Sequence, residues 1–151
     1  MVPLGTPRAQ SAQHLPEIHT ELARLRAIVA AALDEELHAL VDLRASLLNG
    51  CAFCVDLHTD AALKAGVSAQ RVTLVAAWRE AGDHFTEIER AVLEVVDALT
   101  RLGENGLADE VYARAADHLS EREMVALITA VGLINLYNRL GVGTALTPPV
   151  R

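Results

Sequence analysis

Two cysteines and a histidine occur in one short segment of the chain, from Cys51 to His58. Spacings of three and then four residues place Cys51, Cys54 and His58 on one face if the segment is a helix. Asn49-Gly50, directly before Cys51, is typical of a helix stop, so the cysteines come at the start of the next helix. Unpaired N–H groups and the helix dipole there favour thiolate over thiol, and such sites lower a cysteine pKa from about 8.5 to roughly 3.5–7.5.

This arrangement predicts a thiol redox cycle. His58 follows Cys54 by one helical turn and can accept its proton directly or through one water, so Cys54 is the predicted nucleophile and Cys51 the thiol that resolves it. A thiolate that attacks a peroxide O–O bond becomes a sulfenic acid, which condenses with a neighbouring thiol to a disulfide. The two Cα atoms are therefore expected to lie about 4.4–6.8 Å apart.

Two other interpretations of the same residues stay open. Two cysteines on one apolar helix can be inert core residues, because free cysteine packs as a small hydrophobe. Cys-x2-Cys with a histidine also supplies three zinc ligands, although only scattered histidines and carboxylates remain for a fourth. Haem attachment is excluded, because it needs a histidine directly after the second cysteine and Val55 stands there. The redox interpretation requires neither a metal nor a bound organic cofactor.

The composition predicts an all-helical, single-domain protein. Aromatic residues make up only 3% of the 151 residues, whereas alanine and leucine, which are strong helix formers, are abundant. Apolar periodicity and capping residues divide residues 15–143 into a bundle of about seven helices, expected at roughly 16–32, 34–49, 51–65, 68–78, 87–102, 107–118 and 121–140. Residues 1–14 are predicted to be a flexible arm and residues 144–151 a tail.

Charge and hydropathy argue against nucleic acid and membrane as partners. The formal net charge is −7, and no segment carries the cluster of lysine and arginine that binds phosphate backbones or anionic lipid. The longest nearly apolar stretch, 124–137, is too short to cross a bilayer, and the N-terminus has no apolar run of the signal-peptide type, so we expect a cytoplasmic protein. That stretch is apolar almost all round, which predicts a central helix or a homo-oligomer interface.

Residues 44–59 resemble the signature of the alkylhydroperoxidase AhpD-like, carboxymuconolactone decarboxylase superfamily. Residues 78–80 (Trp-Arg-Glu), 89–91 (Glu-Arg-Ala) and 135–140 (Asn-Leu-Tyr-Asn-Arg-Leu) resemble later stretches of these proteins in the same order. The resemblance implies an all-helical fold in an obligate oligomer, commonly a trimer or a hexamer. For members with Cys-x2-Cys-x3-His it implies a thiol-dependent peroxidase or a disulfide reductase.

The resemblance also assigns roles and partners. It makes Cys54 the peroxidatic cysteine, Cys51 the resolving cysteine and His58 the proton-relay histidine. It implies a hydroperoxide as oxidant and a lipoyl or thioredoxin-type thiol as reductant. The true decarboxylases of the superfamily generally lack the cysteine pair, so the pair argues against that activity.

One position departs from the peroxidase pattern. Where those proteins have a glutamate on the preceding helix to accept the proton that histidine relays, this chain has Ala39. The candidates to replace it are Glu35, one turn earlier on the same face, and Glu80 and Asp97 on later helices. The missing glutamate favours a second class of function, a non-catalytic redox sensor or binding protein, whereas the cysteine motif favours the enzyme.

Other polar residues are predicted to have structural roles. Arg44, one turn before the Asn-Gly stop, is expected to form an ion pair or to bind helix C-terminal carbonyls. Amide and guanidinium groups late in an apolar helix need partners, so inter-helix or inter-subunit hydrogen bonds are expected for Asn135, Asn138 and Arg139. The remaining histidines share no metal spacing and are predicted to be surface or capping residues: His14, His19, His38, His84 and His118.

Overall fold

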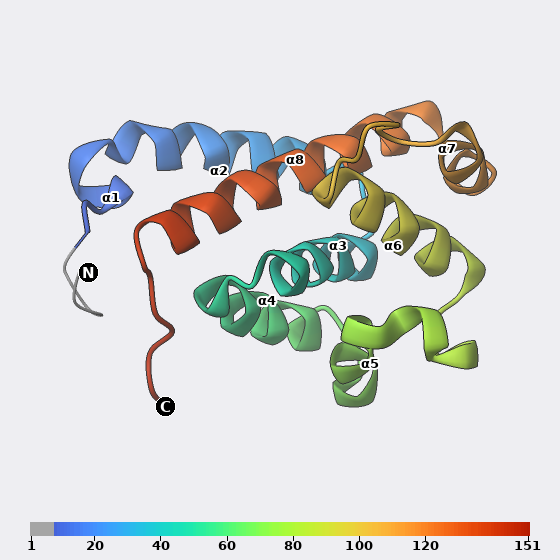
Figure 1. Cartoon of the computed structure of the whole chain (residues 1–151), viewed down its shortest axis with the longest axis horizontal. Helices are drawn as coiled ribbons and strands as arrows, with labels where there is room; N and C mark the ends of the chain where they lie inside the picture. Colours follow the sequence, from blue (N-terminus) through green and yellow to red (C-terminus); the bar gives the residue numbers. More distant parts are fainter. Residues whose placement is uncertain (1–7) are drawn as a thin grey trace.

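The computed structural model describes residues 8–151, which fold into helices joined by short loops (Figure 1). The described chain contains eight α-helices: α1 Ser11–His14, α2 Pro16–Ala30, α3 Glu35–Asn49, α4 Ala52–Lys64, α5 Ala69–Leu74, α6 Glu87–Thr100, α7 Asp109–Ala116 and α8 Glu121–Gly143. Two 3-10 segments, η1 Val75–Glu80 and η2 Gly82–His84, link α5 to α6. No strand occurs between residues 8 and 151, and the all-helical prediction is confirmed.

The predicted capping residues set most of the helix ends. Asp34 caps α3 by accepting a hydrogen bond from the Leu37 backbone N–H (3.1 Å), and Gly50 ends the helix in the left-handed conformation with φ of 65°. Capping boxes begin α6 at Thr86 and α8 at Ser120. These side chains satisfy N–H groups that a helix start leaves unpaired, which is why the local sequence locates the boundaries so well.

Residues 8–14, within the predicted arm, contain a helical turn that the sequence did not indicate. Helix α1 lies beside the end of α8, where Arg8 donates to the carbonyl of Gly143 (3.1 Å) and Gln10 donates to that of Thr144 (3.1 Å). The sequence pattern missed this turn because four residues are too few to show apolar periodicity, and the bonds of Arg8 and Gln10 beside it reach residues more than a hundred positions away. Residues 1–7 of the predicted arm lie outside the described residues.

The segment from α5 to η1 differs from the single helix predicted over 68–78. The α-helical part ends at Leu74, and the chain continues as a 3-10 helix with a kink at Ala77 (φ −126°, ψ 36°). The Arg44 guanidinium accounts for the change, because it donates to the carbonyls of Val75 (3.3 Å) and Ala76 (2.8 Å). A donor from α3 thus binds backbone carbonyls at the start of the 3-10 segment.

Helices α3 and α8 form the centre of the bundle. Helix α3 packs against α4, α6 and α8, and α8 also contacts α2, α6 and α7. Figure 1 shows α2 and α8 running side by side in opposite directions, with α3 and α4 on the inner side of the pair. Leu40, Leu43, Leu127 and Ile134 are among the side chains buried between these elements.

Helix α8 is longer than the apolar stretch that predicted it. It has 23 residues, and by length and hydropathy it would also pass as a membrane-spanning helix, a property that core helices share. Its inner side is buried, as predicted for a central helix, but Val125 is 65% exposed and Val142 is 50% exposed. A single copy of the chain therefore leaves one face of α8 uncovered.

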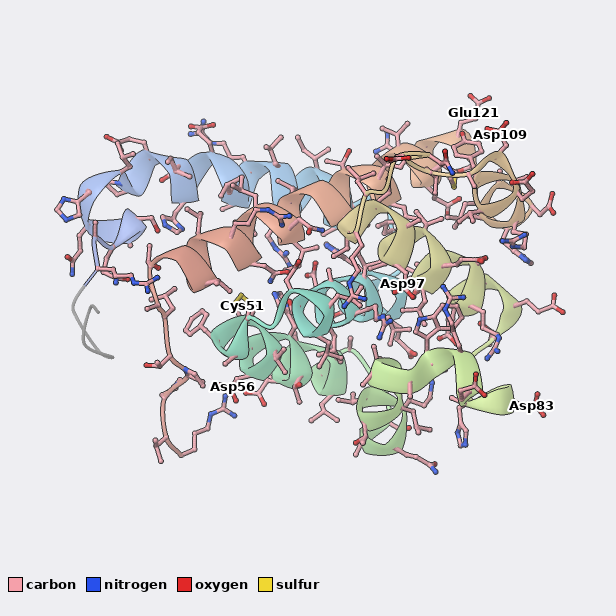
Figure 2. All side chains as sticks on the ribbon, in the orientation of Figure 1. Cys51, Asp56, Asp83, Asp97, Asp109 and Glu121 are labelled. Carbon is pink, nitrogen blue, oxygen red and sulfur yellow. A yellow bond between two sulfur atoms is a disulfide. The ribbon has the colours of Figure 1, made fainter. Side chains whose placement is uncertain are left out.

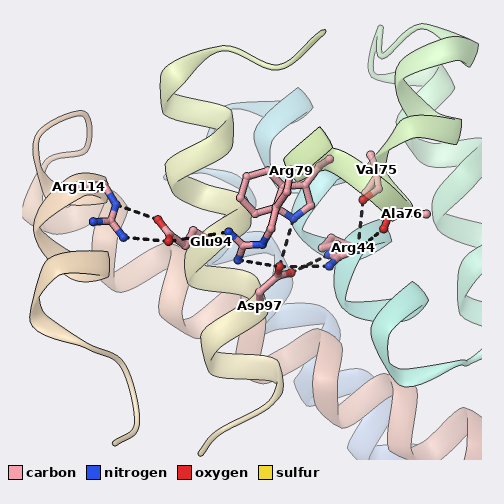
Figure 3. Close-up of polar contacts among 8 residues, drawn as sticks. Arg44, Val75, Ala76, Arg79, Glu94, Asp97 and Arg114 are labelled. Atoms are coloured by element: carbon pink, nitrogen blue, oxygen red, sulfur yellow. Dashed lines mark hydrogen bonds and ion pairs between the residues drawn. The ribbon is translucent and has the colours of Figure 1, made fainter. Parts of the chain in front are cut away.

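Asp97 holds three elements together (Figure 3). Its two carboxylate oxygens accept hydrogen bonds from Arg44 Nε (2.6 Å) and Nη2 (3.1 Å), and Oδ2 also accepts from Trp78 Nε1 (3.2 Å) and Arg79 Nη2 (3.2 Å). The cluster joins α3, η1 and α6. The structural ion pair predicted for Arg44 is confirmed.

The Asp97→Ala variant is expected to lower the free energy of unfolding by about 1–3 kcal/mol, because it leaves part-buried donors of Arg44 and Trp78 without a partner. Urea unfolding followed by circular dichroism measures the change. Glu94→Ala is the matched control on the same helix. It breaks pairs with Arg79 and Arg114 whose guanidinium side chains are about half exposed, so its cost is expected to be ~1 kcal/mol or less. Equal losses in the two variants would contradict this interpretation.

Candidate functional site

Cys51 and Cys54 form a disulfide at the start of α4. The two Cα atoms lie 5.2 Å apart, which confirms the predicted reach. Cys51 is the N-cap residue of α4, and its sulfur accepts a hydrogen bond from the Cys54 backbone N–H (3.3 Å). Figure 2 shows the sulfurs where α4 approaches α8. The helix start that the Asn-Gly stop predicted therefore supplies an N–H group to sulfur.

Gly141 of α8 makes room for this disulfide. A Cβ atom added at Gly141 would lie 2.7 Å from Cys51 Sγ and 3.3 Å from Cys54 Sγ. The sequence pattern alone does not point to Gly141. A glycine within a helix costs stability, which indicates that another group approaches the backbone closely, but the sequence does not show which group.

His58 lies beside the buried carboxylate of Asp42, which was not among the predicted site residues. Its Nδ1 lies 3.5 Å from Asp42 Oδ2, and both side chains are buried, with 9% and 3% exposure. Asp42 comes one helical turn after Ala39 on α3. The carboxylate beside His58 therefore comes from position 42 and not from position 39. An aspartate within an otherwise buried helical stretch, 37–46, was the available signal.

Two further groups converge on Asp42 Oδ2. Arg26 of α2 donates to it at 2.8 Å, and His38 Nε2 lies 3.8 Å away, while Asp42 Oδ1 is buried without a partner among the described residues. The prediction that His38 is a surface or capping residue is wrong. His38 lies one helical turn before Asp42 on α3, and its buried ring faces the Asp42 carboxylate.

Burial lowers the pKa of His58 below its ordinary value, and the nearby Asp42 carboxylate opposes part of this effect. The Arg26 guanidinium and His38 add smaller contributions that lower the pKa further. The pKa of His38 is lowered for the same reasons, with burial as the largest. The lowered pKa favours the neutral form of the His58 imidazole, whose Nδ1 lies beside the Asp42 carboxylate.

The three carboxylates proposed from sequence lie elsewhere. Glu35 and Glu80 are exposed, and Asp97 is occupied by Arg44, Arg79 and Trp78. Among the described residues, the carboxylate beside His58 is Asp42. The difference arises because chain topology, rather than helix periodicity, decides which acidic residue meets the α4 face.

A cavity of about 540 Å³ opens beside Cys54. Residues from both ends of the chain and from α4 line it: Ser11, His19, Arg26, Phe53, Cys54, Leu57, His58, Ala61, Tyr137, Leu140, Gly141 and Leu146. Its size is within the range of small-molecule sites. Cys54 and His58 thus line one cavity, whereas Cys51, which is 2% exposed, is not among its lining residues.

The remaining polar predictions concern α8 and metal ligands. Asn138 donates to Ser46 Oγ (3.0 Å) and both Asn135 and Asn138 accept from Asn49, so the expected inter-helix bonding is confirmed. Arg139 instead donates to Asn135 within its own helix.

Within residues 8–151, no group of three or more histidine, cysteine or acidic side chains is arranged to hold a metal ion.

The chain belongs to the carboxymuconolactone decarboxylase family, which matches it over residues 16–98. The protein YdfG of Bacillus subtilis, whose function is uncharacterised, is 37% identical over 103 residues, covering 68% of this chain and 69% of YdfG. The expected AhpD-like superfamily and fold are confirmed.

Solved structures show the same fold. The structure of ATU0492 from Agrobacterium tumefaciens, a protein of unknown function with a suggested role in AhpD-type antioxidant defence, matches with TM-score 0.90 and 37% identity over 97% of this chain and all of that one. The debrominase Bmp8 shares the fold at TM-score 0.78 and 19% identity, covering 89% of this chain and 73% of that one. At this identity the match with Bmp8 shows the fold alone.

The Gly141→Ala variant is expected to make the disulfide easier to reduce. The added methyl group would collide with both sulfurs in the disulfide, whereas the separate thiols of the reduced protein can turn away. The midpoint potential, measured in defined dithiothreitol mixtures, is expected to become less negative. Gly132→Ala is the control, because the position is on the same helix and nothing lies within 4 Å of an added Cβ. An unchanged potential in Gly141→Ala would contradict the proposed contact.

Proposed function

We propose that the protein is a thiol-dependent peroxidase or disulfide reductase that cycles Cys54 and Cys51 between dithiol and disulfide. One observation carries the proposal: Cys54 lines a cavity together with His58, whereas its disulfide partner Cys51 does not line it. A cytoplasmic setting would supply the thiol reductants that such a cycle requires.

The oxidative half of the cycle begins with the reduced protein. His58 takes the Cys54 proton, and the thiolate attacks the terminal oxygen of a hydroperoxide ROOH, the one that carries hydrogen. The O–O bond breaks, Cys54 becomes a sulfenic acid, and the imidazolium returns the proton to the leaving alkoxide, giving ROH. The Cys51 thiol then attacks the sulfenic sulfur, which forms the disulfide and releases water.

The reductive half needs an external dithiol, of the lipoyl or thioredoxin type. One of its thiolates attacks Cys54, the sulfur that faces the cavity, and forms a mixed disulfide. Cys51 leaves as a thiolate at the start of α4, where an N–H group already points at its sulfur. The second thiol of the reductant then releases it as a disulfide, and the protein returns to the dithiol form.

Asp42 supports the proton transfer in this proposal. A carboxylate at Nδ1 fixes the imidazole ring and stabilises the imidazolium that forms when Cys54 ionises. Because the side chain of Asp42 is 3% exposed, its charge is screened little by water. In this proposal Asp42, one turn further along α3, takes the role of the glutamate that the peroxidase pattern has at the position of Ala39.

A second candidate function is a redox sensor that does not turn over. The low exposure of both cysteine residues, 2% for Cys51 and 4% for Cys54, favours it, because slow access suits a switch better than a catalyst. In that case the disulfide changes a contact, and peroxide consumption stops after one equivalent.

Peroxide turnover with several dithiol reductants separates these functions. The wild type is expected to consume many equivalents and Cys54→Ser none. Without reductant, Cys51→Ser is expected to consume about one equivalent and to keep the sulfenic acid, because that acid has no internal thiol to condense with. Thiol titration and dimedone labelling report the state of each cysteine. One equivalent in the wild type would overturn the enzymatic proposal in favour of the sensor, and oxidation of Cys51 in the Cys54→Ser variant would contradict the assigned roles.

A homo-oligomer, of three or six copies by family resemblance, is the second part of the proposal. An apolar groove between α2 and the first half of α8 is lined by Leu25, Ile28 and Val125, which are 44%, 64% and 65% exposed. A neighbouring copy would remove this surface from water.

The Val125→Asp variant is expected to dissociate the oligomer, because it places a charge in the apolar groove. Light scattering with size-exclusion chromatography at micromolar concentration measures the mass. Leu63→Asp on α4 introduces the same charge at a leucine that is 44% exposed and is expected to leave the mass unchanged. A monomeric wild type would contradict this part of the proposal.

A further inference from the structure

The cavity beside Cys54 has two chemically different walls. Helix α4, the end of α8 and the tail contribute apolar side chains, among them Phe53, Leu57 and Leu146. Helices α1 and α2 contribute Ser11, His19 and Arg26. Although the whole chain has a net charge of −7, none of the residues that line this cavity is acidic. A ligand would therefore meet apolar surface on one side and hydrogen-bond donors on the other.

The Arg26 guanidinium presents positive charge to the cavity. Its Nη2 donates to Asp42 at 2.8 Å, but the Arg26 side chain is 33% exposed whereas that of Asp42 is 3% exposed. The carboxylate that balances the charge is buried and is not among the residues that line the cavity, whereas Arg26 is. Arginine has five N–H donors in a planar fork that suits a carboxylate, and only one is used by Asp42.

His19 stands two helical turns before Arg26 on α2, so the two side chains lie on the same side of that helix. Ser11 Oγ and His19 Nε2 are 2.9 Å apart, a hydrogen bond that orients the ring. When the serine hydroxyl donates to Nε2, Nδ1 carries the proton and is a donor to the cavity. This pair lies outside the Cys54–His58–Asp42 chemistry.

We propose that the cavity binds an aliphatic carboxylate, with the carboxylate on the wall of His19 and Arg26 and the chain against Phe53, Leu57 and Leu146. The proposal rests on the proposed function in one respect, the assumption that the ligand of this cavity reacts at Cys54. Either reactant can carry this chemistry: a hydroperoxide with a carboxylate group, or a dithiol with one.

Calorimetric titration of the oxidised full-length protein with octanoate and with octanamide tests the proposal without any turnover. The two probes have the same chain and differ in charge. Octanoate is expected to bind at least tenfold more tightly than octanamide, and His19→Gln, which keeps the charge of Arg26 but removes the imidazole, is expected to reduce the difference. His14→Gln, an exposed histidine on α1, is the control and is expected to keep it. Equal affinity for the two probes, or full selectivity in His19→Gln, would overturn the proposal.

Kinetics then identify which reactant uses the site. A carboxylate-bearing hydroperoxide is compared with its methyl ester, and dihydrolipoate with dihydrolipoamide. A lower KM for the acid of one pair, lost in His19→Gln, assigns the carboxylate site to that reactant, and no preference in either pair would contradict reaction of the bound acid at Cys54. If octanoate selectivity holds while peroxide turnover is absent, the binding site stands and the proposed function fails.

Discussion

The buried carboxylate of Asp42 is the constraint on which the site depends. A charge this deep is costly unless it is paired, and Arg26 supplies the pair at 2.8 Å while His38 and His58 add imidazole nitrogens at 3.8 and 3.5 Å. The arrangement links α2, α3 and α4 at one point. It also determines which nitrogen of His58 is turned away from the cavity, and so connects the core of the bundle to the chemistry at its surface.

The sulfurs are positioned by helix ends and by one close approach. Gly50 ends α3 and Cys51 caps α4, which brings both cysteines to the helix start, and α8 closes over them through Gly141. Cys54 lines the cavity and Cys51 does not. The proposed direction of the cycle, with Cys54 attacking and Cys51 resolving, rests on this difference.

The sequence predicted what depends on local pattern. Helix ends at Asp34, Gly50 and Thr86 follow from capping chemistry, and the reach of Cys51 to Cys54 follows from their spacing on one helix. It did not predict contacts that depend on which elements meet. Asp42, rather than Glu80 or Asp97, reaches His58 because α3 packs along α4. Glu35 is also on α3, but it lies two turns earlier, at the helix start, and is exposed. Likewise the 3-10 segment η1 depends on a guanidinium from another helix.

The pH dependence of Cys54 alkylation tests the central claim most directly. The measurement uses reduced protein in a Cys51→Ser background, so that iodoacetamide reacts at one thiol, and compares Asp42 with Asp42→Asn and Glu35→Gln. If Asp42 stabilises the imidazolium of His58, the apparent pKa of Cys54 rises in Asp42→Asn and stays unchanged in Glu35→Gln, with circular dichroism confirming that both variants fold. The same alkylation profile in a folded Asp42→Asn variant would contradict the account.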